Sequence, residues 1–214
     1  MSETKLREDI CRHAKSIFDR GLTGGSSGNI TALTEDGNLL VTPTGSTFAA
    51  LDPARLSLLD KDGRLLSGDP PTKELPLHTA FYETRATTGA VVHLHSSYSV
   101  ALSMLPDIDP DNVLPPLTAY SIMRLGKVKL LPHFRPGDPA MGDAVRALEG
   151  QRSAVLLANH GPVVSDKTLD AAVYATEELE ETAKLALLTR GLSPIMLTEP
   201  QIRDVVDHFN VEWD

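Results

Sequence analysis

The sequence has a single cysteine, Cys11, among its 214 residues. An internal disulfide framework is therefore excluded, and a lone thiol is typical of a protein in a reducing compartment. Cys11 lies beside an apolar stripe at helical spacing, which favours the role of a small buried residue. We therefore expect a protein of the cytoplasm.

Basic residues and long apolar runs are also scarce. Lysine and arginine number 20 against 29 aspartates and glutamates, which gives a formal net charge of −9. This balance argues against a general nucleic-acid-binding protein, because no basic patch would attract phosphates. No apolar run approaches the length of a membrane span, and the first residues contain no apolar signal core. We expect neither a nucleic-acid partner nor a membrane partner.

Hydrophobic periodicity and turn residues predict hairpins interspersed with helices. The expected helices cover residues 3–20, about 76–84, a short stretch from about 97, 141–148, about 167–190 and 202–209. The expected strands cover residues 29–33, 38–41, 56–59, 64–66, 90–97, 128–131, 154–157 and 162–165, and residues 106–119 are expected to form a loop. Because strands and helices do not alternate regularly, we expect a mainly antiparallel or mixed sheet with helices packed on it, in one domain over residues 1–214.

The expected strand over residues 90–97 carries two histidines, His93 and His95. Side chains alternate along a strand, so both imidazoles should stand on one face while Val92 and Leu94 point to the other. Converging nitrogen donors suit a divalent metal. A histidine pair on a strand can also be incidental, and that alternative stays open here.

Two further residues are candidates for the same site. His160 lies at an expected strand-to-strand turn beside Gly161, from where its imidazole could project into a cleft. Three nitrogens with an open position are what a catalytic zinc site requires, but a turn histidine can also serve only as a hydrogen-bonding group. Glu74 precedes an expected helix and could ligate a metal or move protons, or it could be a solvated acid favoured by the helix dipole. The remaining histidines are expected on the surface or on helix faces: His13, His78, His133 and His208.

Two loops rich in small residues could bind an anion. The segments Ser26-Ser27-Gly28-Asn29 and Thr44-Gly45-Ser46 can present backbone N–H groups and hydroxyls. Thr72-Lys73 could add a hydroxyl and a cation. None of these segments is a nucleotide-binding fingerprint, and each taken alone could be a plain turn.

Taken together, these segments resemble the class II aldolase/adducin family over about residues 3–210. Five motifs carry the resemblance, in the order Gly25-Ser26-Ser27-Gly28-Asn29-Ile30, Thr42-Pro43-Thr44-Gly45, Lys73-Glu74, His93-Leu94-His95 and Asn159-His160-Gly161. The resemblance implies an α/β fold with a central, mainly antiparallel sheet flanked by helices. It also implies a homo-oligomer, often a tetramer, with active sites at subunit boundaries.

The resemblance implies roles for individual residues. In this family three histidines bind a divalent metal, usually zinc, and the glutamate is both a ligand and an acid/base. Carried onto this chain, the metal site is Glu74, His93, His95 and His160. The implied contacts to a sugar phosphate are Ser27, Gly28, Asn29, Thr44, Gly45, Thr72 and Lys73. Tyr120 lies in roughly the region of a catalytic tyrosine of the family's aldolases.

Three segments, residues 71–78, 117–126 and 135–139, are most similar to one branch of the family. That branch decarboxylates 3-oxo-tetronate 4-phosphate to dihydroxyacetone phosphate and CO₂ through a metal-stabilised enediolate. The resemblance therefore implies a zinc-dependent lyase that acts on a small sugar-acid phosphate. Fuculose-phosphate aldolases usually have a serine where Lys73 stands. Both they and the family's pentulose-phosphate 4-epimerases use a tyrosine near the C-terminus. No tyrosine follows Tyr174 in this chain, which counts against both activities.

Three other functions stay open on the sequence alone. A class II sugar-phosphate aldolase of the fuculose type would release an aldehyde instead of CO₂. A non-catalytic scaffold, as in the adducin branch, has no need of a metal triad, and this chain has all three histidines. A protein with a structural zinc site should unfold when the metal is removed.

Overall fold

The computed structural model describes residues 2–213, which contain one eight-stranded sheet. Its strands are β1 Asn29–Leu33, β2 Leu39–Val41, β3 Ser57–Leu59, β4 Leu65–Ser67, β5 Ala90–His93, β6 Lys129–Leu131, β7 Ala154–Leu157 and β8 Gly161–Asp166. The strand order is β4-β3-β2-β1-β5-β8-β7-β6, and only β6 and β7 pair in parallel. The mainly antiparallel sheet that the sequence predicts is therefore confirmed.

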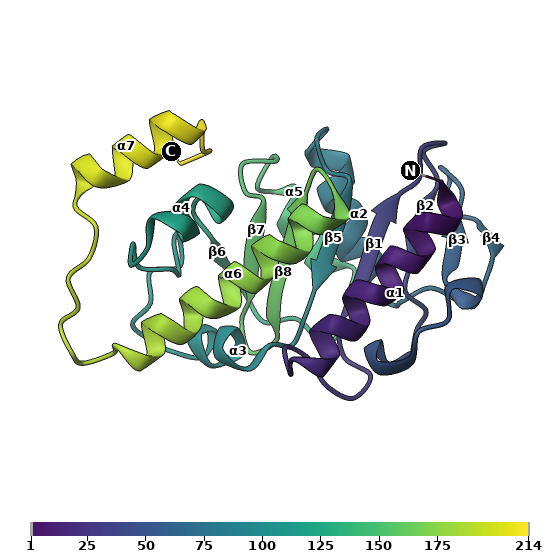
Figure 1. Ribbon diagram of the computed structural model, residues 1–214, viewed down its shortest axis with the longest axis horizontal. Helices are drawn as coiled ribbons and strands as arrows, with labels where there is room; N and C mark the ends of the chain where they lie inside the picture. The colour runs from purple at the N-terminus through teal and green to yellow at the C-terminus, as the bar shows by residue number, and fades with distance from the viewer. Residues whose placement is uncertain (1, 214) are drawn as a thin grey trace.

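Helices cover both faces of this sheet (Figure 1). They are α1 Glu3–Asp19, α2 Leu75–Thr84, α3 Ser97–Ser103, α4 Ala119–Leu125, α5 Ala140–Arg146, α6 Leu169–Leu188 and α7 Glu199–Phe209. One face packs against α1, α3, α4 and α6, and the opposite face packs against α2 and α5. The C-terminal helix α7 packs on α4, away from the sheet.

The central strand β5 contributes side chains to the apolar clusters on both faces of the sheet. Val92 belongs to the apolar cluster under α1, whereas Val91 belongs to the cluster under α2 and α5, because successive side chains alternate. Both valines are fully buried, and such burial typically stabilises a fold by about 1.5–3 kcal/mol for each side chain. His93 lies two residues after Val91 on the same strand, so its side chain also faces the α2 side of the sheet.

The structure differs from the sequence-based prediction at the end of β5. The predicted strand continues to residue 97, but β5 ends at His93. The register pairs Asn29 with His93, and Asn29 is the first residue of β1, so β1 offers no partner beyond this point. His95 consequently lies in the connection to α3.

Helix α4 is absent from the prediction. It begins after Thr118, whose hydroxyl accepts a hydrogen bond from the Ser121 backbone, and it buries Ile122 and Leu125. Its two buried apolar side chains are too few to define an apolar period, and the helix directly follows a stretch rich in proline. Two short 3₁₀ helices were missed for the same reason, at Phe48–Ala50 and Pro53–Arg55.

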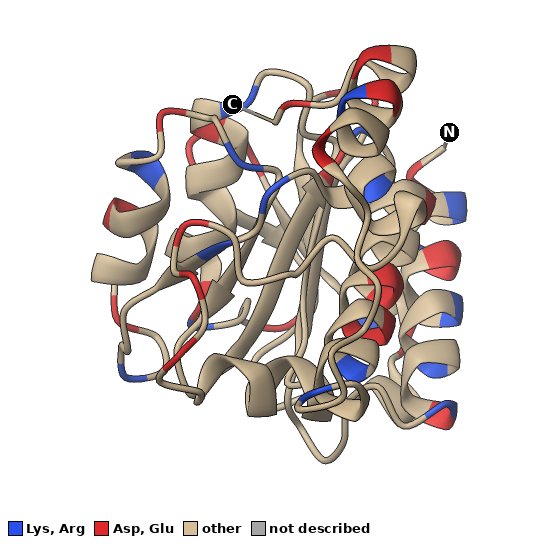
Figure 2. Ribbon diagram, turned by 90° about the vertical axis from the view of Figure 1, so that its left-hand side faces the viewer, with Lys and Arg blue, Asp and Glu red and all other residues tan. Residues whose placement is uncertain are grey.

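Charged side chains lie on the helices and loops, and the strands of the sheet are almost free of them (Figure 2). Within residues 2–213, no helix combines the length and the apolar composition needed to cross a membrane. Cys11 is half-buried against the apolar cluster under α1, and burial raises the pKa of its thiol to about 11. A thiol with such a pKa is a poor nucleophile, which agrees with the packing role expected from the sequence.

Candidate metal centre

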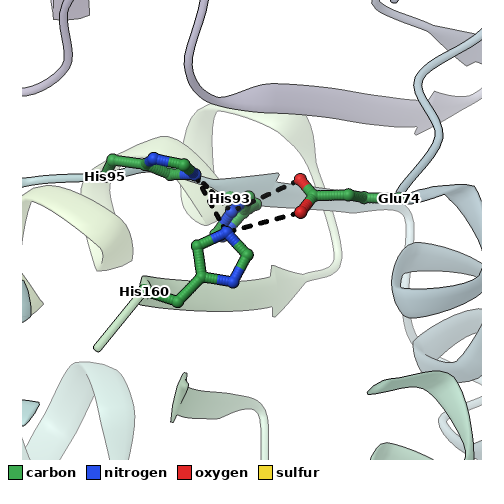
Figure 3. Close-up of side chains that lie close together, drawn as sticks. All are labelled: Glu74, His93, His95 and His160. Atoms are coloured by element: carbon green, nitrogen blue, oxygen red, sulfur yellow. Dashed lines mark hydrogen bonds and ion pairs between the residues drawn. The ribbon is translucent and has the colours of Figure 1, made fainter. Parts of the chain in front are cut away.

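Four side chains from three parts of the chain meet at one end of the sheet (Figure 3). His93 ends β5, His95 follows it by two residues, His160 lies in the turn between β7 and β8, and Glu74 directly precedes α2. One nitrogen or oxygen atom from each residue lies within 4.8 Å of those from the other three. The structure thus brings together the four residues that the sequence analysis assigned to a metal site.

The three imidazoles direct the same ring nitrogen toward a common point. His95 Nε2 lies 3.1 Å from both His93 Nε2 and His160 Nε2. On its other side, His93 Nδ1 lies 2.9 Å from the carbonyl oxygen of Pro162, so Nδ1 carries the hydrogen and donates it. Neutral His93 therefore presents a lone pair on Nε2, as a metal ligand must.

The carboxylate of Glu74 completes the cluster from the α2 side. Asn29 Nδ2 donates a hydrogen bond of 2.8 Å to Glu74 Oε2, and Oε2 lies 3.5 Å from His93 Nε2. The other oxygen, Oε1, lies 3.4 Å from His160 Nε2 and, among the described residues, is buried without a hydrogen-bond partner. A buried carboxylate oxygen without a partner is costly unless a cation or a proton occupies its lone pairs.

Electrostatics favour the deprotonated form of every group in the cluster. Burial lowers the pKa of His93, His95 and His160, which keeps the rings neutral at neutral pH. For Glu74, burial opposes ionisation, but the hydrogen bond that the Asn29 amide donates favours the carboxylate, and the pKa of the carboxyl lies below its usual value. Three imidazole nitrogens with one carboxylate oxygen form a donor set that fits a divalent metal such as zinc.

The backbone of the turn that carries His160 is tightly constrained. The Asn159 backbone has a positive φ of 57° and donates its N–H to the Ser103 hydroxyl of α3. Gly161 has a φ of 154°, and a Cβ atom there would lie only 2.1 Å from the carbonyl oxygen of Leu94. The close approach of these two backbones places His160 beside His95.

The segment that leaves His95 is held by a buried acid of α6. Glu180 is 5% exposed and accepts hydrogen bonds from the backbone N–H groups of Tyr98 and Ser99, each at 2.8 Å. The Ser99 hydroxyl donates a third at 2.5 Å. Glu180 thereby caps the first turn of α3, which begins two residues after His95.

We expect Glu180→Ala to destabilise the fold by about 2–3 kcal/mol, because three donors lose a charged acceptor in a buried place. Urea denaturation measures this change in the free energy of unfolding. Glu181→Ala is the matched control, since Glu181 is exposed and its ion pair within residues 2–213 is the one of 3.4 Å with Lys184. A loss of stability for Glu180→Ala no larger than that of the control would contradict the capping role.

The segments predicted to hold a sugar phosphate lie side by side next to Glu74. The Thr42 backbone links two segments, because its N–H donates to the Ile30 carbonyl and its own carbonyl accepts from the Thr72 N–H. The Thr72 hydroxyl accepts from the Glu74 backbone at 3.3 Å. These bonds hold side by side the segments that carry the loops around residues 27–29, 44–45 and 72–73; we call these three loops the rim, and the phosphate contacts themselves stay a prediction.

The residues of this rim differ in what they can offer. Thr44, Gly45 and Lys73 are exposed, and a Cβ atom at Gly45 would meet open space. Within residues 2–213 no ion pair involves the Lys73 ammonium, and a Cβ atom added at Gly137 would lie 3.3 Å from the Cβ atom of this lysine. By contrast, the Ser27 hydroxyl donates to the Gly24 carbonyl inside its own turn at 2.6 Å.

Tyr120 is a predicted catalytic residue that lies away from the cluster in this chain. It lies on α4, is 54% exposed, and has the Arg124 guanidinium 5.4 Å from its ring centre. It lines a cavity of about 530 Å³ together with Tyr174 and Glu177 of α6. A catalytic role for Tyr120 inside its own subunit therefore has no geometric support.

Comparison with known proteins shows the family to which the chain belongs. The family model for the class II aldolase and adducin N-terminal domain matches residues 8–187. The chain belongs to the class II aldolase and adducin family.

Relatives within this family are similar over almost the whole chain. The 3-oxo-tetronate 4-phosphate decarboxylase of Escherichia coli K12 is 50% identical over 204 residues, which are 95% of this chain and 96% of that protein. The decarboxylase of Cupriavidus necator is 44% identical over 99% of both chains. The 5-deoxy-D-ribulose 1-phosphate aldolase of Bacillus thuringiensis is 31% identical, over 96% of this chain and 95% of the aldolase.

Solved structures of the class II aldolase family share the fold. A crystal structure of YgbL from Escherichia coli is 46% identical, with a TM-score of 0.93 over 95% of this chain and 98% of that one. An L-fuculose 1-phosphate aldolase is 25% identical, with a TM-score of 0.84 over 96% of each chain. The class II aldolase fold expected from the sequence is thus confirmed.

The sequence analysis missed three polar residues that lie behind Glu74. His78 lies on a helix face, as expected, but it is fully buried and contacts Asn29. Thr31 and Tyr82 continue the same line of contacts. The spacing of Glu74, His78 and Tyr82 by four residues could have indicated that they share one side of a helix.

Proposed function

We propose that the protein is a 3-oxo-tetronate 4-phosphate decarboxylase, which releases CO₂ and forms dihydroxyacetone phosphate. The observation that carries this proposal is 43–50% identity to decarboxylases of this name over at least 95% of the chain. An aldolase of the same family is only 31% identical over a similar length. The enzyme is a carbon–carbon lyase.

The substrate has a ketone in the β position to its carboxylate, and a phosphate at the far end. When the bond between C1 and C2 breaks, CO₂ leaves and its electron pair stays on C2, conjugated with the C3 carbonyl. A divalent metal held by the cluster supplies, when bound, Lewis-acid stabilisation of the negative charge on the substrate oxygens. In our proposal this metal is zinc.

Glu74 is the proton carrier in this proposal. C2 must take up a proton after CO₂ has left, and the Glu74 carboxyl, or a water that it positions, delivers that proton. Its Oε1 atom is the oxygen without a hydrogen-bond partner among the described residues, so it is available for this transfer. C2, which carried the carboxylate in the substrate, is thereby the carbon of a CH₂OH group in the product.

The rim beside Glu74 binds the phosphate. Thr44 offers a hydroxyl and Gly45 a backbone N–H at an exposed turn, and Thr72 lies next to them. Lys73 adds a flexible ammonium that either binds the phosphate or faces the departing carboxylate. We further propose that the chain acts as one domain in a cytoplasmic homotetramer, in which Tyr120 would reach a site only from a neighbouring subunit.

A class II sugar-phosphate aldolase is the second candidate, because its reaction leaves the same charge distribution on dihydroxyacetone phosphate. Loading the protein with zinc and comparing kcat/KM for 3-oxo-tetronate 4-phosphate and for L-fuculose 1-phosphate separates the two. We expect a strong preference for the first substrate. A preference for the second, with release of an aldehyde, would overturn the decarboxylase in favour of the aldolase.

Removal of the metal tests the catalytic nature of the site. We expect a chelator to abolish turnover while circular dichroism shows a protein that is still folded, because the cluster lies at the ends of the central strands β5 and β8, and the sheet has its own apolar core. Unfolding on chelation would indicate a structural site instead.

A further inference from the structure

A continuous line of hydrogen bonds runs from Glu74 into the space between α2 and β1. Asn29 Nδ2 lies 2.8 Å from Glu74 Oε2, and Asn29 Oδ1 lies 2.5 Å from His78 Nε2. His78 Nδ1 lies 3.0 Å from Thr31 Oγ1, which lies 2.9 Å from Tyr82 Oη. Five side chains of two elements are therefore joined end to end.

The spacings of the helix and the strand explain why these side chains meet. Glu74, His78 and Tyr82 follow one another at intervals of four residues, so they lie on one side of the helix. Asn29 and Thr31 are two residues apart on β1 and share the sheet face toward α2. Four helical residues rise about 6 Å and two strand residues about 6.7 Å, so the two rows interdigitate with a nearly matched period.

Hydrogen-bond chemistry allows one direction along this line. A carboxylate only accepts, so the Asn29 amide nitrogen faces Glu74, and the Asn29 oxygen then needs a donor. His78 Nε2–H is that donor, and burial lowers the pKa of His78 to about 4, which keeps the ring neutral. Its Nδ1 atom must then accept from the Thr31 hydroxyl, to which the Tyr82 hydroxyl donates in turn.

We propose that Asn29 and His78 are positioning residues, which hold Glu74 by its Oε2 atom and leave Oε1 free for metal or proton. A flipped Asn29 amide would turn its oxygen toward the carboxylate, and the His78 donor prevents that flip. The Oε1 atom lies 3.4 Å from His160 Nε2, on the ligand side of the cluster. This inference rests on the proposed function in one respect, because the proposed function assigns metal binding and proton transfer to Glu74.

The positioning role competes with the phosphate contact that the sequence predicts for Asn29. Asn29 is 6% exposed, and each of its two side-chain polar atoms is engaged in the line. His78 is fully buried, so it cannot touch a phosphate. If Asn29 acts on Glu74, weakening the His78 contact should reproduce the effect of losing Asn29, whereas a phosphate ligand would not depend on His78 in this way.

The first test reads the hydrogen position in the unmodified protein. Long-range ¹H–¹⁵N spectra of protein with ¹⁵N-labelled histidine distinguish the two tautomers of each neutral imidazole. We expect His78 in the Nε2–H form without any added metal, and His93 in the Nδ1–H form because of the Pro162 carbonyl. A His78 ring with its hydrogen on Nδ1 would overturn the direction of the line and the proposal with it.

The second test measures zinc affinity by competition with a chelating dye, which needs no substrate. His78→Gln keeps a nitrogen donor at the reach of Nε2, whereas His78→Asn carries its amide near Nδ1 and leaves Asn29 Oδ1 without a donor. Loss of a hydrogen bond that orients a ligand typically weakens metal binding about 10–100-fold. We expect such a loss for Asn29→Ala and His78→Asn, and less than about threefold weakening for His78→Gln.

The double variant Asn29→Ala with His78→Asn should bind zinc no more weakly than Asn29→Ala alone, because both changes remove the same contact. Thr79→Ala is the control on α2, since the Thr79 hydroxyl only donates to the Pro76 carbonyl. Wild-type zinc affinity of His78→Asn, or additive losses in the double variant, would overturn the proposal.

Steady-state kinetics with the substrate that the enzyme turns over distinguish positioning of Glu74 by Asn29 from a contact of Asn29 with the phosphate. A positioning role predicts that kcat falls while KM changes less than about threefold, and a phosphate ligand predicts the reverse. If the protein fails to release CO₂, the proposed function falls, but the tautomer and the zinc affinities remain decisive for the positioning role.

Discussion

Glu74→Gln should lower kcat by about 10²–10⁴-fold, which is the usual contribution of a positioned acid or base. Glutamine has the shape of glutamate, and its amide oxygen can still accept the hydrogen bond from Asn29. Its amide cannot take up or deliver a proton near neutral pH, so the protonation of C2 loses its carrier. Steady-state kinetics on zinc-saturated protein measure the effect.

Metal content separates this loss from loss of the site. We expect Glu74→Gln to retain zinc better than His93→Ala, because His93 supplies a lone pair from a fully buried ring that the Pro162 carbonyl already orients. Glu83→Gln is the matched control on α2, since Glu83 is exposed and pairs with Arg146. Wild-type turnover in zinc-loaded Glu74→Gln would remove the proton-transfer role of this residue.

Gly161→Ala should destabilise the fold by more than about 3 kcal/mol and abolish zinc binding. The new Cβ atom would lie 2.1 Å from the Leu94 carbonyl oxygen and 3.3 Å from the Cα atom of His95. Both neighbours are backbone atoms, so β8 and the segment after β5 would have to move apart. That movement separates His160 from His95, which now approach to 3.1 Å.

Chemical denaturation and zinc titration of this variant measure the two effects. Gly191→Ala is the control, because Gly191 has a positive φ of 80° but open space where the Cβ atom would stand. We expect the control to lose only about 1 kcal/mol and to bind zinc normally. A Gly161→Ala protein with the stability of the control would show that the close backbone approach does not hold the site.

The elements of the fold could largely be predicted from local patterns, because most strands and helices here are amphipathic or bounded by turn residues. The helix α4 could not, since its two buried apolar side chains are too few to give a period. The end of β5 was also missed, because it depends on where its neighbour β1 begins. Pairing between distant segments decides such boundaries, and a single strand's sequence does not contain it.

The candidate site was predictable in its members but not in its contacts. Two histidines separated by one residue indicated a shared strand face, and the resemblance to class II aldolases added Glu74 and His160. The contacts behind Glu74 join β1 to α2 across more than 40 residues, so neither Asn29 nor His78 revealed its partner. Tyr120 shows the opposite case, because the resemblance suggested a catalytic residue that this subunit holds away from its own cluster.

Decarboxylation itself is tested most directly by turnover of 3-oxo-tetronate 4-phosphate in D₂O with zinc-loaded protein. We predict CO₂ and dihydroxyacetone phosphate in equal amounts, with one deuterium on the carbon that carried the carboxylate, because that carbon takes its proton after CO₂ has left. The absence of CO₂ from a zinc-loaded, folded protein would contradict the account.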